Sequence, residues 1–178
     1  MPLPADCRGV PLAETIDTDK PVREAALYGL HCGHVNVTDG RYTYMRGPAD
    51  PENNRPLYEY TLMPTHMRSF FELDKLKTME RVEPFSFTKG VPVMKIKARH
   101  WRVLDLQTLL FDLEKDPEQE KPIRDEKAEE MMTDHMVRLM RENDCPPEQF
   151  ERLGLARTGD VPKDITKDAI TTRQDGGE

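Results

Sequence analysis

The stretch GLHCGHVNVTDGRYTYMR, residues 29–46, predicts a β-hairpin, and the rest of the fold follows from it. Asp39 and Gly40 form a two-residue turn signal, because a type I′ turn needs positive φ at both central positions. Pairing outward from this turn sets Thr38 opposite Arg41. The same register pairs Val37 with Tyr42, Asn36 with Thr43, Val35 with Tyr44 and His34 with Met45.

The hairpin has one apolar face and one polar face, because side chains alternate across a strand. The apolar face comprises Val35, Val37, Tyr42 and Tyr44. Such branched and aromatic cross-strand pairs stabilise a sheet by roughly 0.2–1 kcal/mol each. We expect a helix on this face, which leaves His34 and Asn36 facing away from that helix.

The remaining pattern predicts an α+β fold, in which a small antiparallel sheet of about four strands packs against a long C-terminal helix. Further strands are predicted at Glu24–Leu30, Leu57–Met63, Val93–Lys97 and Thr108–Leu113. The long helix is predicted at Asp125–Asn143, with one apolar stripe at three- and four-residue steps. The stripe comprises Ala128, Met131, Met132, His135, Met136, Leu139 and Met140. A short helix, Glu148–Leu153, is predicted to end at Gly154.

Three segments divide the chain. Residues 1–23 are predicted to be an irregular lead-in, 24–155 the folded subdomain, and 156–178 a disordered polar tail.

The apolar stripe of the long helix includes His135, so we expect this histidine to be buried in the core and hydrogen-bonded.

Composition narrows the classes of function. The formal net charge is -7, and nucleic acid is not an expected partner, because phosphate binding needs a concentrated basic surface. No apolar run has the length of a membrane span, so no membrane partner is expected. The N-terminus lacks a signal-peptide pattern, which predicts a cytoplasmic location for the chain as given and leaves the compartment of a longer protein open. Cys7, Cys32 and Cys145 have no zinc-module spacing.

The histidines of the hairpin allow three interpretations. His31 and His34 are candidate metal ligands only if a bulge forms at residues 32–33, because strand residues three apart point to opposite faces. Together with Asn36 they are also a candidate substrate rim. The third interpretation is a polar, partly solvated sheet face.

A second candidate pair lies in PTHMRS, residues 64–69. His66 and Arg68 could bind an anion, since the arginine fork fits sulfate or carboxylate. An exposed loop pair is the alternative. No complete catalytic constellation is present, and we expect no catalytic residue and no metal ligand in this chain.

Four segments, in order, carry a resemblance to a known family. They are EAALYGLHCGHVNVTDGRYTYMR, NRPLYEYTLMPTHMRS, PFSFTKGVPVMKI and LLFDLEKDPEQEKPI. Together they resemble the C-terminal region of the sulfatase family, within the alkaline phosphatase superfamily. The long helix and NDCPPEQFERLGL resemble the usual end of one bacterial group of these enzymes. The resemblance runs from about Gly9 to Leu155.

The resemblance implies a two-part enzyme. The large domain of such a sulfatase holds a formylglycine nucleophile, made from Cys or Ser in a C/S-x-P-x-R motif, and a divalent cation, usually calcium. This chain would be the smaller C-terminal subdomain. The implied partner is the missing N-terminal catalytic domain, and the implied substrate of the intact enzyme is a sulfate ester.

The chain departs from the family at the motif that carries the chemistry. Cys7 and Cys32 have no proline two places on. Cys145 has that proline, but Gln149 stands where arginine is required, and neither serine starts the motif. We therefore expect no cofactor here and no activity of the chain alone. The alternative hypothesis is a self-standing, non-catalytic binding or oligomerisation module.

Overall fold

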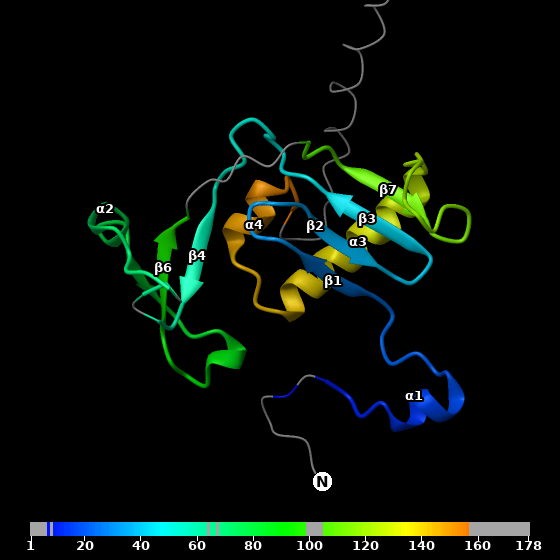
Figure 1. Cartoon of the computed structure of the whole chain (residues 1–178), viewed down its shortest axis with the longest axis horizontal. Helices are drawn as coiled ribbons and strands as arrows, with labels where there is room; N and C mark the ends of the chain where they lie inside the picture. Colours follow the sequence, from blue (N-terminus) through cyan, green and yellow to red (C-terminus); the bar gives the residue numbers. More distant parts are fainter. Residues whose placement is uncertain (1–6, 8, 64, 67, 99–104, 157–178) are drawn as a thin grey trace, which may run out of the picture.

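The structure, a computed structural model, describes residues 7, 9–63, 65–66, 68–98 and 105–156. Within these residues it consists of two antiparallel sheets and four α-helices (Figure 1). The predicted α+β class is confirmed. The predicted disordered tail lies, from residue 157 on, outside the described residues.

The first sheet contains the hairpin and has the strand order β1-β2-β3-β7. Its strands are β1 (Ala26–Gly29), β2 (Val35–Thr38), β3 (Tyr42–Arg46) and β7 (Leu109–Asp112). All neighbouring pairs are antiparallel, and β7 joins the free edge of β3 with Tyr44 opposite Leu110.

The predicted register of the hairpin is wrong by two residues. Val37 lies opposite Tyr44, not Tyr42. The turn is wider than a two-residue type I′ turn, because only Gly40 has positive φ (95°) and Asp39 does not. Instead, the Asp39 carboxylate accepts hydrogen bonds from the backbone N–H groups of residues 41 and 42, at 2.9 and 2.7 Å. A shift of two preserves the faces of both strands, since the side-chain period is two.

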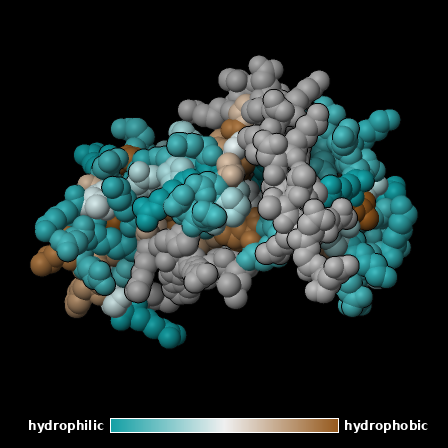
Figure 2. Space-filling model, turned by 90° about the horizontal axis from the view of Figure 1, so that it is seen from above, coloured by the Kyte–Doolittle hydropathy of each residue, from teal (hydrophilic) through white to brown (hydrophobic). Residues whose placement is uncertain are grey.

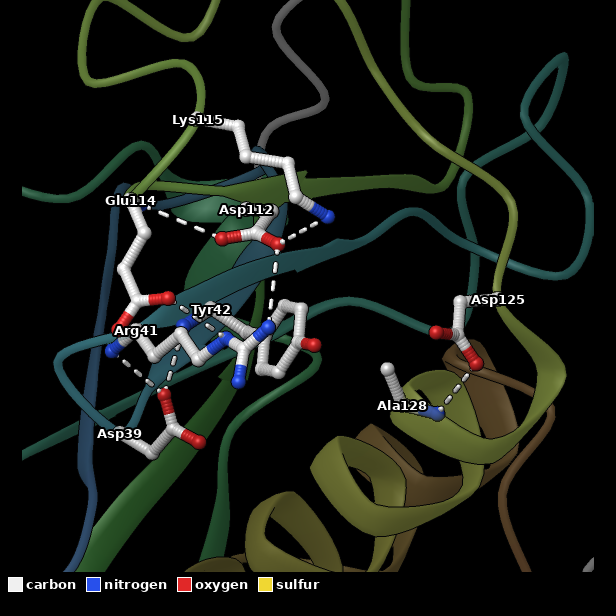
Figure 3. A network of polar contacts seen from close by, with 8 residues as sticks. All are labelled: Asp39, Arg41, Tyr42, Asp112, Glu114, Lys115, Asp125 and Ala128. Atoms are coloured by element: carbon white, nitrogen blue, oxygen red, sulfur yellow. Dashed lines mark hydrogen bonds and ion pairs between the residues drawn. The ribbon is translucent and has the colours of Figure 1, made fainter.

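A buried carboxylate ties this turn to β7 (Figure 3). Asp112 is buried at the end of β7 and pairs with Arg41 at 3.4 Å and with Lys115 at 3.1 Å. Burial alone would raise the pKa of Asp112, but hydrogen bonds from Lys115 and Arg41 hold it below its ordinary value. The segment after β7 is therefore fixed against the hairpin turn.

The long helix α3 (Glu126–Glu142) packs on the apolar face of the first sheet and contacts β1, β2 and β3. It is one residue shorter at each end than the predicted helix, and the Asp125 side chain caps it by accepting from the N–H groups of residues 127 and 128. The core between helix and sheet includes Val37, Tyr44, Leu110, Ala128, Met132, Met136 and Met140.

The predicted stripe is wrong at Met131, which is 39% exposed on the solvent side of the helix. His135 is half-buried at the edge of the helix, where its Nδ1 lies 3.0 Å from the Arg138 guanidinium. It is therefore hydrogen-bonded but outside the core.

The prediction of one sheet is also wrong, because the middle of the chain forms a second sheet with the order β4-β6-β5. Its strands are β4 (Tyr58–Thr61), β5 (Glu80–Val82) and β6 (Val93–Lys97), with α2 (Leu73–Leu76) and a 3₁₀ turn (Ser86–Thr88) in the connections. The predicted strand at residues 57–63 therefore pairs with β6, with Tyr60 opposite Lys95.

The remaining helices are short. The helix α4 (Pro147–Arg152) begins with a proline in its first turn and is followed by Gly154 at φ 63°, as predicted. The helix α3 is thus not the last element of the chain. The short helix α1 (Ala13–Thr18) lies in the predicted irregular lead-in and has no buried residue. Among the described helices, none has the length and apolarity of a membrane span.

Candidate functional site

The turn between β1 and β2 contains His31, and buried polar side chains hydrogen-bond to its backbone. Cys32 is buried and has φ 66°, a left-handed backbone conformation that residues other than glycine rarely adopt. Asn54 donates from Nδ2 to the Cys32 carbonyl oxygen at 2.7 Å, and Arg152 donates to the Gly33 carbonyl oxygen at 3.3 Å. We call these two residues, Asn54 and Arg152, the bracket of the turn. His31 itself is exposed. Backbone strain of this kind persists only where the surroundings over-determine it.

Arg152 is the centre of that bracket. Its guanidinium is buried and also donates to Asn54 Oδ1 at 2.8 Å and to Gln149 Oε1 at 3.0 Å. Burial lowers the pKa of Arg152, because the charged form loses water. The hydrogen bonds from this guanidinium to neutral oxygens fix the geometry of the turn, but burial of the cation costs solvation free energy.

His34 immediately precedes β2, and Asn36 is the second residue of that strand. His34 Nε2 lies 2.9 Å from the Gln107 carbonyl oxygen. Asn36 lies opposite Tyr28 of β1 and Met45 of β3, on the face of the sheet away from α3. It is 7% exposed, not solvated, and its Oδ1 has no hydrogen-bond partner among the residues that the structure describes. Burial of a polar oxygen without a hydrogen bond costs free energy.

We expect Asn36→Val to leave the free energy of unfolding unchanged or to raise it by up to about 1 kcal/mol, because the buried unpaired oxygen is removed and Val suits a central strand. Urea denaturation followed by circular dichroism measures this. A loss above about 1 kcal/mol would mean that the amide stabilises the sheet.

His66 and Arg68 lie in the connection between β4 and α2 and are not part of this turn. His66 Nδ1 lies 3.9 Å from Glu59 Oε2, and its ring packs on Phe71 with 4.2 Å between centroids. Glu59 is also bonded by Lys75 at 2.6 Å. Arg68 is exposed. The five candidate residues therefore lie in two separate regions, one at β2 and the turn before it and the other in the connection after β4.

A third polar cluster joins the second sheet to α4. Glu148, on α4, accepts a hydrogen bond from the Tyr60 hydroxyl at 3.0 Å and another from the Lys95 ammonium. Burial alone would raise the pKa of Glu148, but the bonds from Lys95 and Tyr60 hold it below its ordinary value. These residues line a cavity together with Cys145.

Burial raises the pKa of the Cys145 thiol from 9.0 to about 11. A rise of two units lowers the thiolate fraction near pH 8 by about 100-fold. We expect iodoacetamide at pH 8 to alkylate Cys145 at least about tenfold more slowly than the exposed Cys7, by peptide mass spectrometry. Equal rates would show that the thiol is open to solvent and easily ionised.

Sequence reasoning missed the Arg152 bracket and the Tyr60–Lys95–Glu148 cluster. Their members lie up to 119 residues apart, and no local pattern marks them. One weak signal exists in the pair Asn53-Asn54, two residues before Pro56. Asparagine tolerates the left-handed backbone conformation that Asn54 adopts. In the described part of the chain, no three His, Cys, Asp or Glu side chains are grouped closely enough to hold a metal ion.

No family model, curated protein or solved structure matches the chain. The class that fold and site define is an α+β unit of two small antiparallel sheets, with its polar groups gathered at a strained turn and at a cavity.

Proposed function

We propose that the chain is the C-terminal subdomain of a sulfatase-family sulfuric ester hydrolase, and that it acts together with a separate catalytic domain. The observation that carries the proposal is the order of the four family-like segments. Segments 24–46 and 109–123 supply β1, β2, β3 and β7 of one sheet, and segments 54–69 and 84–96 supply β4 and β6 of the other. Each quoted segment thus contributes at least one strand.

The chemistry would come from the partner. In the intact enzyme, formylglycine would supply the nucleophile and a calcium ion would stabilise negative charge on the sulfate group. The residues of this chain do not fit either group, since the C/S-x-P-x-R motif is absent from the sequence. The role of this chain is to present a preorganised rim, with the exposed His31 on the bracketed turn and His34 beside it. Asn36 is buried and is not part of this rim.

Exposed apolar side chains support a partner of domain size. Phe70 and Leu73, in the connection between β4 and β5, are 85% and 78% exposed, and Leu30 is exposed beside the bracketed turn. Figure 2 shows apolar atoms at the left end of the molecule, which is the end of the second sheet in Figure 1. Exposed apolar groups of this kind mark interaction surfaces.

We expect the chain alone to release no phenol from an aryl sulfate in the presence of calcium, because it has no nucleophile motif. The measurement is phenolate absorbance over hours at high protein concentration. Turnover that persists through repurification and disappears on mutation of a residue of this chain would contradict the proposal.

The direct test mixes the chain with the catalytic domain of a sulfatase from the same bacterial group, truncated before its hairpin. The proposal predicts a one-to-one complex by light scattering and recovery of arylsulfatase turnover. Leu73→Asp should weaken the complex, whereas Ile16→Asp, equally exposed on α1, should not. Failure of the intact chain to associate with any such domain would support the alternative of a self-standing module.

A further inference from the structure

A cavity of about 530 Å³ lies between the second sheet and the segment that joins α3 to α4. This volume is in the range of small-ligand sites. One wall is aromatic, with the rings of Tyr60 and Phe85 tilted at 60° and 5.4 Å apart. The other wall is formed by Cys145, Pro146 and Pro147. Both walls offer apolar surface.

The charges of the cavity disfavour an anion. Its charged lining residues are Glu83, Lys95, Arg141, Asp144 and Glu148, so acidic side chains outnumber basic ones by three to two. A sulfate ester would therefore meet net negative charge, and this cavity is not a second site for the substrate proposed above.

The contacts also disfavour an organic cation. The Glu148 carboxylate already accepts hydrogen bonds from Lys95 and Tyr60. The Lys95 ammonium further lies 4.2 Å over the ring of Tyr58. Glu148 and Lys95 are thus already paired within the protein. Their remaining donor and acceptor positions suit neutral hydroxyl groups.

We infer that this cavity binds a neutral pyranose ring. A pyranose has apolar C–H groups on its faces and hydroxyl groups around its rim. The aromatic and proline walls can take the faces, while Lys95 donates to hydroxyl oxygens and Glu148 accepts from hydroxyl protons. The inference rests on the cavity alone and does not depend on the proposed relationship to sulfatases.

Titration of the full chain with methyl β-D-glucopyranoside, followed by amide NMR shifts, tests the inference. We expect shifts at Tyr60, Phe85, Lys95, Cys145 and Glu148, with a Kd on the order of 1–10 mM for so small a ligand. No shift at these amides, or shifts with tetramethylammonium chloride but none with the glucoside, would overturn it.

A matched pair of variants locates the binding. Phe85→Ala removes a cavity wall and should weaken binding about fivefold. Phe87→Ala is the control, because Phe87 is 56% exposed and stacks on Phe85 from outside the cavity lining. Equal effects of the two variants would overturn the inference.

The unaltered chain provides a measurement that needs no variant. Saturating glucoside should slow alkylation of Cys145 by iodoacetamide at least about threefold, because the ligand covers the thiol. The exposed Cys7 is the internal control and should react at an unchanged rate. Unprotected Cys145 at a saturating glucoside concentration would overturn the inference.

Discussion

Met136→Asp should unfold the protein. Met136 is fully buried between α3 and the first sheet, with Val37, Tyr44 and Met140 in the same core. An unpaired carboxylate there loses both its hydration and the packing of the methionine, which costs at least about 4 kcal/mol. Because the whole stability of a domain is about 5–15 kcal/mol, thermal denaturation should show little or no folded state at 25 °C.

Met131→Asp is the matched control on the same helix. Met131 is 39% exposed, so its carboxylate stays in water and the loss should be less than about 1 kcal/mol, mostly from helix propensity. A melting temperature of Met136→Asp within error of the unaltered chain would contradict the packing of α3. So would equal losses for the two variants.

Arg152→Ala should lower the free energy of unfolding by about 2–4 kcal/mol. The change leaves Asn54 Oδ1 and the Gly33 carbonyl oxygen buried without their donor, at about 1–3 kcal/mol each. Removal of a buried charge offsets part of this loss, because the guanidinium no longer has to be desolvated. Arg152→Lys should lose a similar amount, since an ammonium cannot reproduce the planar fork.

Arg138→Ala is the control for loss of an arginine. Arg138 is exposed and pairs with Glu24 at 2.9 Å, a surface pair for which the expected loss is below about 1 kcal/mol. Urea denaturation gives both values, and amide hydrogen exchange at residues 32–34 reports the turn directly. A loss below 1 kcal/mol for Arg152→Ala, with exchange unchanged, would show that the bracket does not hold the turn.

Local chemistry determined the elements that the sequence predicted well. The α3 helix has an apolar period of three to four residues and a capping Asp125, and its bounds differ from the prediction by one residue at each end. The α4 helix has Pro147 at its start and Gly154 after its end. Each of these signals acts within a few residues, so it can be recognised from the local sequence alone.

The hairpin shows where local signals stop. Its two faces were predicted correctly, because alternation depends only on the strand period. Its register was not, because the Asp39 carboxylate bonds the turn and Asp112 of β7 pairs with Arg41 beyond it. A turn signal specifies that the chain reverses, whereas the partners of the turn decide by how many residues.

Only the tertiary structure decided the second sheet, the bracket and the cavity. The strand β4 reads equally well as a neighbour of the hairpin, and its pairing with β6 depends on which edges are free. Gly47 shows the same dependence, since a Cβ there would lie 1.8 Å from the Leu106 carbonyl oxygen. Arg152 reaches Gly33 across 119 residues of chain. Sequence patterns report which side chains are apolar or polar, but contact between distant segments arises only when the folded core brings their backbones together.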